Sequence, residues 1–462
     1  MPSLLPRRTL LVTAAGGLMA GLAARASAAP RQKAAARAQP ARIALAQEFG
    51  LGTDTNGDQS VLLQTAIDQA ALNGVALQLP PGRIRVAGVA LRRGTHLLGQ
   101  PGTVLQGFGS RAVLHADMAN ALRIERIAIE GEGAGSGTEA PISLLEIRAS
   151  RDIVIADVTV RRAPRNGLHL VGCSGRVQAS RIERVGAAAL WALDSMGLEI
   201  VGNTVSDCAD NGILVWRSSA GEDGTLVSQN RIARVAAASG GSGQNGNGIN
   251  VFRAGRVRVV HNDIADCAYS AVRGNAASNI QIVGNSVARI GEVALYAEFG
   301  FEGALIAQNI VDGAAAGISV TNFNEGGRLA VIQGNLVRNL RRREAEPQDK
   351  RGEGISVEAD AAVSGNTIEG APTAGIVIGW GRFMRNVSAT GNVIRRARVG
   401  IAITADAAAG HCLVAQNVIA DATDGAIRHV DHGRPTGDDL AFAPPRSDRI
   451  VVSGNVVSGD GA

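Results

Sequence analysis

The sequence predicts an all-β fold: a right-handed parallel β-helix of about 11–12 coils with an N-terminal capping helix. Three observations predict it. An asparagine recurs at intervals of at least 23 residues, each interval holds three short apolar stretches, and a helical pattern precedes the repeats. A chain of 462 residues would ordinarily suggest several globular domains, but repeat proteins grow by stacking instead.

Residues 1–28 are typical of an export signal. Arg7-Arg8 precede an uncharged stretch that is too short and weakly apolar for a membrane anchor, and Ala26-Ser27-Ala28 supplies a cleavage site. The paired arginines resemble a twin-arginine signal, although no lysine follows them in the leader. An Ala/Arg-rich linker, residues 29–45, comes next. We expect export by the twin-arginine machinery, a periplasmic or secreted mature protein, and no membrane attachment after processing.

Residues 46–90 have the pattern of an N-terminal cap with a helix and the first strands. Helical spacing of apolar residues runs from Ser60 to Asn73, with Ser60 expected as the N-cap and Gly74 as the stop. An apolar strand and a Pro-Pro-Gly turn follow. A helix placed over the first coil would shield its core and its unpaired edge.

The repeat, a small residue followed by Asn, any residue and an aliphatic residue, fills residues 91–462. Its asparagines are Asn203, Asn230, Asn262, Asn285, Asn309, Asn335, Asn366, Asn392, Asn417 and Asn455. Asp157 and Ser180 occupy the same position in two earlier coils. A minimum spacing near 23 with only longer exceptions indicates a fixed unit with loop insertions. We expect a ladder of side-chain amides at a turn where Asn tolerates left-handed geometry, rather than a row that contacts glycans.

Each unit contains three short apolar strands, for example residues 198–201, 204–205 and 212–216. Strands this short satisfy their backbone only by pairing with the same strand of the next coil. A leucine-rich repeat would need Leu-dominated units and a propeller about 40 residues per blade, so neither fits. A β-sandwich is the remaining alternative.

Leader, cap and repeats together resemble the twin-arginine-translocated repeat proteins with pectate-lyase-like β-helices. Families of that superfamily often carry Pro-x-Gly-x-Tyr after the first strand; here Ile84 stands in the position of the Tyr. The resemblance covers nearly the whole chain and implies the fold and export. It carries no catalytic motif that could be transferred to this sequence.

The charge distribution argues against a nucleic-acid partner, and the cysteine spacing argues against a disulfide. The formal net charge of +5 comes from the N-terminal tail, and the sequence from Ile43 onward sums to −2. No basic stripe for nucleic acid is present. Cys208 and Cys267 occupy equivalent positions two coils apart, roughly 9–10 Å, which is too far for a disulfide. We expect Cys173, Cys208, Cys267 and Cys412 to be buried free thiols.

The third strand of each coil is where the resemblance places a groove. Eleven seven-residue windows on these strands cover 77 of 462 residues, yet they hold seven of the 13 aromatic residues, where about two are expected by chance. The middle coils also carry Arg, Glu and Asn at outward positions. The sequence therefore predicts a polysaccharide or oligosaccharide site there. The candidate catalytic residues are Arg273, Tyr296, Glu298 and Glu358, and the candidate substrate-binding residues are Trp191, Trp216, Arg217, Asn250, Phe252, Arg253, Asn275, Asn322 and Trp380.

Two enzyme classes could use this patch. A lyase or epimerase of an acidic, uronate-containing polysaccharide needs a base that removes the C5 proton. Arg273 or Tyr296 is the candidate for this base. It also needs a cation for the carboxylate, for which Arg217 and Arg253 are suited. This reaction class is the favoured hypothesis.

A polysaccharide hydrolase is the second hypothesis. Glu298 and Glu358 lie two coils apart in one row, roughly 9–10 Å, at the upper edge of the roughly 6.5–9.5 Å range for inversion. Non-catalytic glycan binding and a purely structural repeat remain alternatives, because such charges can also solvate an outward face.

No cofactor is identified, and a Ca²⁺ requirement has no support in the sequence. His429, Asp431 and His432, with Asp438-Asp439, are metal-ligand types, but His429 falls on an inward row. No metal site is therefore predicted. Insertions at residues 239–248 and 341–353 precede third strands and could border the groove.

Overall fold

The structure, a computed structural model, describes residues 42–133, 140–241, 243–345, 351–445 and 448–459, which fall within one compact unit that starts at Arg42. The predicted signal peptide and most of the linker lie outside these residues. None of the described helices is long and apolar enough to cross a membrane.

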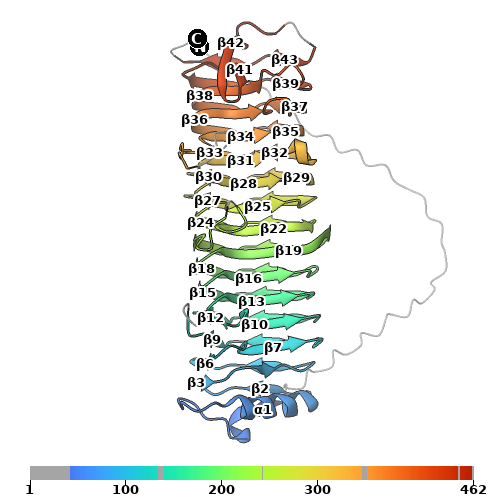
Figure 1. Ribbon diagram of the computed structural model, residues 1–462, viewed down its shortest axis with the longest axis vertical. Helices are drawn as coiled ribbons and strands as arrows, with labels where there is room; N and C mark the ends of the chain where they lie inside the picture. Colours follow the sequence, from blue (N-terminus) through green and yellow to red (C-terminus); the bar gives the residue numbers. More distant parts are fainter. Residues whose placement is uncertain (1–41, 134–139, 242, 346–350, 446–447, 460–462) are drawn as a thin grey trace, which may run out of the picture. The chain divides into compact units, whose positions relative to one another are not determined.

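The strands form three faces of stacked coils (Figure 1). Face 1 is a sheet of sixteen strands: β1 (Ile43–Leu45), β2 (Ala76–Gln78), β5 (His96–Leu98), β8 (Arg123–Glu125), β11 (Ile153–Ala156), β14 (Gly175–Gln178), β17 (Glu199–Val201), β20 (Leu226–Ser228), β23 (Arg258–Val260), β26 (Ile280–Val283), β29 (Glu302–Ala307), β32 (Arg328–Gln333), β35 (Ala359–Ser364), β37 (Arg385–Thr390), β39 (Cys412–Ala415) and β43 (Ile450–Ser453).

Faces 2 and 3 share the second sheet, because β36 and β38 each run around the corner between them. Face 2 contains β3 (Gly82–Arg85), β6 (Thr103–Gln106), β9 (Ala128–Glu130), β12 (Thr159–Arg161), β15 (Arg181–Val185), β18 (Thr204–Cys208), β21 (Arg231–Val235), β24 (Asp263–Cys267), β27 (Ser286–Ala288), β30 (Ile310–Asp312), β33 (Leu336–Arg338), the first part of β36 (Thr367–Ile378) and of β38 (Val393–Thr404), β40 (Val418–Ala422) and β44 (Val456–Ser458).

Face 3 contains β4 (Val89–Ala90), β7 (Leu114–Asp117), β10 (Ser143–Arg148), β13 (Asn166–Val171), β16 (Ala188–Leu193), β19 (Asn211–Glu222), β22 (Asn247–Gly255), β25 (Val272–Asn275), β28 (Val293–Glu298), β31 (Ala316–Val320), β34 (Glu353–Val357), the second part of β36 and of β38, and β41 (Ile427–Asp431) with its antiparallel partner β42 (Arg434–Asp439). All other strand pairs within the described chain are parallel and join one coil to the next, which confirms the β-helix.

The coil count of 11–12 is wrong, since face 1 alone stacks sixteen described strands. The early coils were missed because their ladder positions carry other residues. One assignment was also shifted by a residue: Ala156 pairs with Gln178, so Val158, not Asp157, is level with Ser180. Accordingly, the Val158 amide donates to Ser180 Oγ at 3.1 Å.

The asparagine ladder is confirmed. Asn262 is typical: its Oδ1 accepts the backbone amide and the side-chain amide of Asn230, both at 3.0 Å, and its Nδ2 donates to Asn285 Oδ1 at 3.0 Å. The same contacts run from Asn203 to Asn455. Apart from Asn455 these side chains are buried. From Asn203 to Asn455, the ladder satisfies backbone groups of each coil at the corner between faces 1 and 2.

The left-handed residue at that corner is the one before the asparagine. Gly202, Gln229, His261 and their equivalents have φ between +49° and +68° from Arg126 onward. From β8 onward the corner always has two residues, the left-handed one and the ladder one. The insertions therefore lie only at the other two corners.

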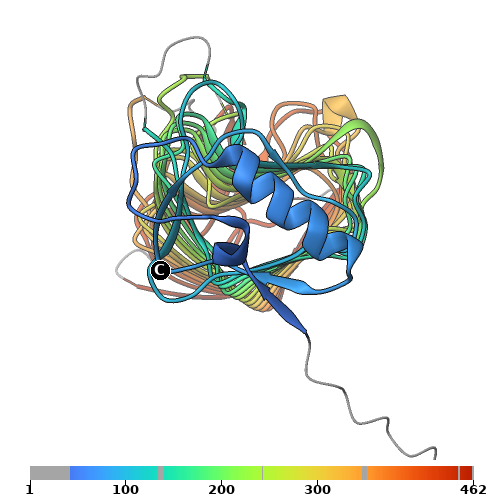
Figure 2. The same cartoon turned by 90° about the horizontal axis from the view of Figure 1, so that it is seen from below.

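The N-terminal cap is the helix α1 (Ser60–Leu72), which lies across the end of the coil stack (Figure 2). Its residues Leu63, Ala66, Ile67 and Ala70 are buried in the core. Gln59, rather than Ser60, is the N-cap, and the Ser60 amide bonds Asp58 Oδ1 at 2.9 Å. Gly74 has φ +62° just after the helix, as expected.

Two short elements complete the description. A 3-10 helix, η1 (Ala46–Phe49), follows β1, and η2 (Phe323–Glu325) lies between β31 and β32. Because β1 pairs with β2, the linker ends before Ile43 and not at residue 45. The core is mainly aliphatic and includes Phe301, and all four cysteines are buried free thiols, as predicted.

Candidate functional site

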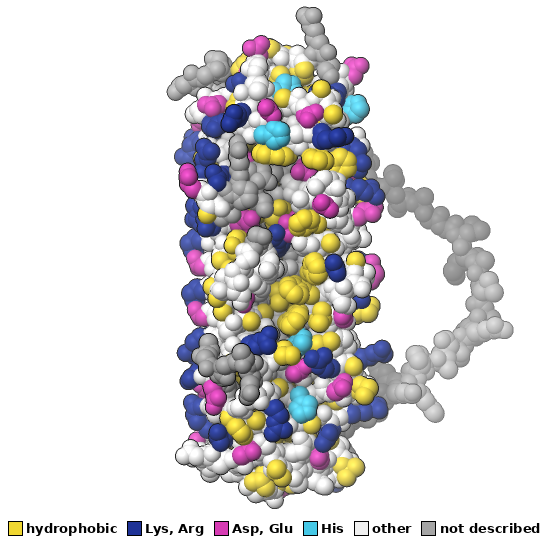
Figure 3. Space-filling model, in the orientation of Figure 1, with side chains coloured by type: hydrophobic (Ala, Val, Ile, Leu, Met, Phe, Trp, Pro, Cys, Tyr) yellow, Lys and Arg dark blue, Asp and Glu magenta, His cyan; other side chains and the backbone are white. Residues whose placement is uncertain are grey.

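Face 3 carries a continuous line of aromatic rings across four coils. His169 stacks on Trp191 with ring centroids 4.4 Å apart and planes at 22°. Trp191 meets Trp216 edge-on at 5.8 Å, and Trp216 meets Phe252 in the same way at 5.8 Å. We call these four residues the aromatic strip. Figure 3 shows hydrophobic side chains gathered about halfway along this side of the molecule, in the region of β16, β19 and β22.

Strand register places the strip. His169, Trp191, Leu214 and Asn250 pair in one outward row, and Leu193, Trp216 and Phe252 pair in the next. Trp191, Trp216 and Phe252 are each half-buried, so part of every ring is open to solvent.

A bulge in β19 forms one edge of the strip. Trp216 pairs with Phe252 and Gly221 with Ala254, so residues 217–220 bulge out opposite Arg253 alone. Asp194 accepts the Ser218 amide at 2.8 Å, and Arg253 Nη1 donates to the Ser218 carbonyl at 3.0 Å. The bulge thereby sets two arginines, Arg217 and Arg253, beside the aromatic rings.

These two arginines differ in their surroundings. The Arg253 guanidinium is exposed and lies over the Phe252 ring, with 4.7 Å from Cζ to the centroid. The Arg217 Nε and Nη1 atoms are buried and have no hydrogen-bond partner among the described residues. Donor groups of a guanidinium are suited to a carboxylate.

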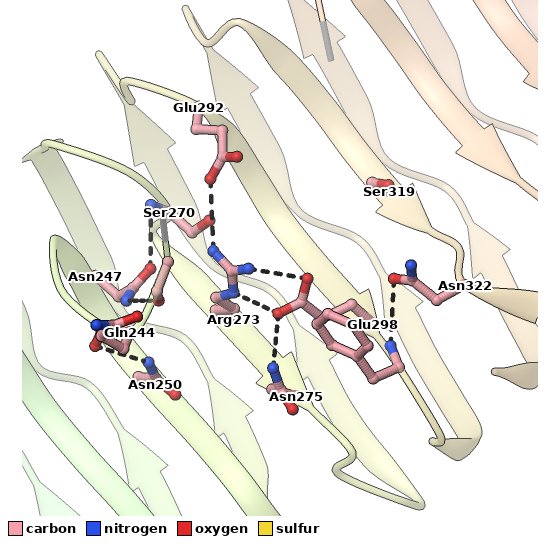
Figure 4. Close-up of polar contacts among 12 residues, drawn as sticks. Gln244, Asn247, Asn250, Ser270, Arg273, Asn275, Glu292, Glu298, Ser319 and Asn322 are labelled. Atoms are coloured by element: carbon pink, nitrogen blue, oxygen red, sulfur yellow. Dashed lines mark hydrogen bonds and ion pairs between the residues drawn. The ribbon is translucent and has the colours of Figure 1, made fainter. Parts of the chain in front are cut away.

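The predicted catalytic residue Arg273 is not available as a base. Its side chain is buried between two carboxylates, with Nε–Oε1 of Glu298 at 2.5 Å, Nη2–Oε2 of Glu298 at 2.9 Å and Nη1–Oε2 of Glu292 at 3.5 Å (Figure 4). Burial opposes the charged form, but the two carboxylates outweigh it and hold the pKa of Arg273 above its usual value. The guanidinium is occupied by these two carboxylates, an arrangement that does not favour Arg273 as a base.

Residues 243–247, in the loop before β22, cover this ion cluster. A Cβ added at Gly243 would overlap the Arg273 guanidinium. The loop is held down by Asn211 Nδ2 to the Gln244 carbonyl at 3.1 Å, and by Asn247 Nδ2 to the Gly243 carbonyl at 2.8 Å. The insertion could border the groove; its described residue Gly243 lies directly over Arg273.

Tyr296 and the two glutamates do not assemble the other predicted sites. Tyr296 is 3% exposed and packs with Val293 and Ala316. Glu298 is 1% exposed and is occupied by Arg273 and by Asn275 Nδ2 at 2.9 Å. A buried carboxylate bound in this way does not form the open carboxylate pair that a hydrolase needs.

The remaining candidates are dispersed over face 3 and its edge. Glu358 accepts the Phe323 amide at 2.6 Å, and Asn322 accepts the Phe299 amide at 3.3 Å, so both hold turns. Asn250 is buried and accepts Trp216 Nε1 at 3.3 Å, which fixes that ring in the strip. Trp380 lies in another region, beside His432.

Sequence reasoning missed His169 as a member of the strip. Its row was recognised, but an isolated histidine gives no signal of ring stacking. Both ring nitrogens are buried without a hydrogen-bond partner among the described residues. Burial lowers the pKa of His169, which Glu146 at 4.0 Å partly counteracts.

No group of three or more His, Cys, Asp or Glu side chains in the described part of the chain is placed to hold a metal ion. His429 pairs with the inward Ile403 in β38, and His432 Nδ1 contacts Asp431 at 2.6 Å.

Comparisons with known proteins agree with the fold. Residues 166–327 and, overlapping them, 211–394 match the family model described as a right handed beta helix region. With the coil geometry, this makes the protein a right-handed parallel β-helix.

Solved structures resemble the chain at low sequence identity. The N-terminal fragment of gene product 12 of bacteriophage Phi29 has a TM-score of 0.51 and 14% identity, over 90% of this chain and 70% of that one. The catalytic unit of an α-1,3-glucanase from Streptomyces thermodiastaticus has 0.46 and 16%, over 91% and 70%. The A-module of a mannuronan C-5 epimerase from Azotobacter vinelandii has 0.43 and 15%, over 89% and 98%. These likenesses concern the fold.

Proposed function

We propose that this right-handed β-helix binds an acidic polysaccharide along the aromatic strip. The unbroken ring contact from His169 to Phe252 across four coils is the observation that supports the proposal most. Coils repeat at about 4.8 Å, so the strip offers successive apolar surfaces along one line. Aromatic side chains supply such apolar area at little cost in conformational freedom.

The acidic character of the polymer follows from the arginines at the edge of the strip. Arg253 is exposed over Phe252, and Arg217 has buried donors without partners among the described residues. A uronate carboxylate lying beside the rings would accept from these guanidinium groups. The proposal extends to location: the leader would send the mature chain to the periplasm or the exterior by the twin-arginine machinery.

Binding, rather than turnover, is the function we assign to the strip. Lyase, epimerase and hydrolase chemistry would all require accessible acid or base groups. Arg273, Tyr296 and Glu298 are buried, and Gly243 lies over Arg273.

The test uses the purified mature chain with alginate, pectins and glycosaminoglycans. Binding is measured by affinity electrophoresis and calorimetry, and turnover by absorbance of unsaturated uronate and by reducing ends. We expect binding to at least one acidic polymer and neither turnover signal. Turnover would reassign the protein as an enzyme, and absence of binding to every polymer would refute the proposal.

Trp216→Ala locates the site. The variant should bind about 30-fold more weakly, which corresponds to about 2 kcal/mol, the cost typical of an aromatic residue at the centre of an interface. Phe442→Ala is the matched control, because Phe442 is 61% exposed and lies outside the strip. Equal affinity of the two variants would exclude the strip as the binding surface.

A further inference from the structure

An uncharged surface covers the second half of face 1, from β26 to β43. Its outward side chains pair from coil to coil in two rows, and neither row contains a charged residue. In the six strands before it, from β8 to β23, the first row contains four charged residues, Arg123, Arg176, Glu199 and Arg258. We call the following residues the uncharged surface: Gln281, Leu305, Val331, Ala362, Ser388, Leu413 and Val451 in the first row, and Val283, Ala307, Gln333, Ser364, Thr390, Ala415 and Ser453 in the second.

Large aliphatic side chains gather on the uncharged surface and at its edge. Leu305, Leu329, Val331, Leu413 and Val451 are each 36–44% exposed. Leu305 pairs with Val331, and Leu413 pairs with Val451. Leu329 precedes Val331 by two residues and so points outward as well. Contiguous exposed apolar side chains of this kind are typical of a protein–protein contact.

The backbone of Leu329 has an unfavourable conformation for a leucine. Its φ of +63° lies in the left-handed region, where a bulky side chain is strained and Gly, Asn or Asp is the usual residue. The equivalent residues of neighbouring coils are of those types, namely Asn279, Gly303, Asp360 and Asn386. The Leu329 side chain is itself exposed, so packing within the chain does not account for it. A strained, exposed leucine favours a partner that covers it.

Charged side chains at the edge of the uncharged surface form pairs. Arg328 Nη2 lies 2.6 Å from Glu302 Oε1, and Arg385 forms an ion pair with Asp360. Two copies of this surface can therefore face each other without like-charge repulsion. A strongly charged partner, in contrast, would find no opposite charge in either row. The charge pattern favours a second copy of the chain as the occupant.

The uncharged surface is large enough for a specific dimer contact. Its seven strands, about 4.8 Å apart, extend over about 34 Å, and the outward residues from Asn279 to Val283 extend over about 17 Å of each strand. These dimensions give roughly 600 Å² per copy and roughly 1,200 Å² for two copies, which is the lower end of the range for specific interfaces. An interface of this size is expected to be reversible.

We propose that the uncharged surface joins two copies of this chain in a twofold symmetric dimer. In such a dimer the same surface of each copy meets its equivalent, so the surface has to be compatible with itself in charge. Leu329 and the apolar residues around it would be buried against the other copy, and this burial would offset the backbone strain. The aromatic strip lies on face 3 of earlier coils and stays open in both copies. The inference is independent of the proposed function.

Sedimentation velocity of the mature chain tests the dimer. We expect a reversible dimer whose fraction rises with concentration up to about 0.1 mM, the range in which a weak specific interface is populated. Val331→Asp places a carboxylate of each copy in the contact and should weaken self-association about tenfold or more. Val393→Asp is the matched control, because Val393 is 43% exposed at the start of β38 on face 2, and it should leave the equilibrium unchanged. Circular dichroism and thermal unfolding verify that each variant is folded.

Leu329→Asn separates an interface from a merely structural role. Asparagine tolerates the left-handed backbone, so this variant should unfold at the same or a higher temperature, yet self-associate several-fold more weakly. The inference is overturned if the chain is monomeric at every concentration, if Val331→Asp weakens the dimer no more than Val393→Asp, or if Leu329→Asn leaves the dimer unchanged. A monomer that dextran retards in affinity electrophoresis through Val331 would give the surface another occupant and also overturn it. Trp216→Ala should dimerise as the wild type does, so a failure of polysaccharide binding leaves this test intact.

Discussion

Arg273 and Glu298 lie on neighbouring coils of face 3 and form a two-point ion pair, with side chains 7% and 2% exposed. Arg273 also reaches Glu292, and Asn275 donates to Glu298. Such a closed cluster joins three coils, since Arg273 lies in β25, Glu298 in β28, and the covering loop precedes β22. The middle of face 3 is therefore held by buried charges rather than opened as a catalytic cleft.

Removal of one charge from this cluster should be strongly destabilising. Glu298→Ala leaves the buried Arg273 without its main partner, so we expect a loss of about 3–5 kcal/mol in the free energy of unfolding, measured by urea denaturation. Arg273→Met combined with Glu298→Leu should recover most of it. Glu302→Ala breaks an exposed pair with Arg328 and should cost at most about 1 kcal/mol. Equal losses in the two single variants would contradict the burial argument.

A break in the asparagine ladder should be costly at one coil. Asn309→Ala removes the acceptor of the Asn285 amide at 2.9 Å and the donor to the Ile282 carbonyl at 2.9 Å. Each buried group left unpaired costs about 1–3 kcal/mol. Thermal and urea unfolding should show the loss, and hydrogen exchange should show the Asn285 amide less protected. Asn324→Ala, at an exposed residue outside the ladder, is the control and should change stability little.

The free energy of unfolding should decrease in mild acid, in part because of His169. Burial lowers the pKa of His169 below the usual value of about 6.5, so the unfolded chain binds a proton more readily than the folded one. The stability that this residue contributes is complete above about pH 6.5 and declines as the pH drops toward the folded value.

His169→Phe should keep the stacking on Trp191 and reduce this decline. The measurement is the unfolding free energy of both proteins between about pH 7.5 and pH 5. Burial also lowers the pKa of His429. Because both proteins contain His429, its contribution cancels when their unfolding free energies are compared. If the unfolding free energies of the two proteins depend on pH in the same way, His169 takes up its proton equally in the folded and the unfolded state.

The arginines at the strip should make polymer binding sensitive to salt. Arg253→Ala should weaken binding of the acidic polysaccharide by a factor of about 1.4 to 5 at low ionic strength, because an exposed ion pair contributes roughly 0.2–1 kcal/mol. The difference should vanish near 1 M salt, where the screening length is about 3 Å. Arg176→Ala, an exposed arginine on face 1, is the control and should bind as the wild type does.

The four thiols should not react with a thiol reagent until the chain unfolds. All are buried, and burial raises the pKa of Cys208 to about 12. A thiol reagent at about pH 8 should find no fast-reacting cysteine in the native protein, because the thiolate is the reactive form. Four thiols per chain should react in denaturant. A fast-reacting thiol in the native state would show local opening of the coil that contains it.

The features that recur in every repeat could be predicted from the sequence. The ladder from Asn203 to Asn455 and the outward positions of polar side chains in the middle coils, such as Asn250 and Arg273, were both predicted, because the coil length and the alternation of a strand are local patterns. The coils before that of Val158 were not found, since no side chain like those of the ladder marks them. A spacing of 22 or 23 residues could not by itself separate Val158 from Asp157.

The accessibility of the site could not be predicted. Whether Arg273 faces solvent depends on a loop that begins more than thirty residues before it and on Gly243, whose missing Cβ leaves room for the guanidinium. Likewise, the bulge at residues 217–220 depends on where β19 resumes pairing with β22. Loop placement and bulge position are tertiary properties that periodicity does not encode.

The constant two-residue corner between faces 1 and 2 also has a consequence for how such a chain could be altered. Coils can differ in the length of every other connection, as residues 236–246 and 321–327 illustrate, without disturbing the asparagine register. The number of coils and the lengths and sequences of the loops can therefore change independently of each other. A recognition loop could be transplanted onto face 3 of one coil while its neighbours keep their pairing, and a whole coil could be inserted wherever an asparagine meets an asparagine.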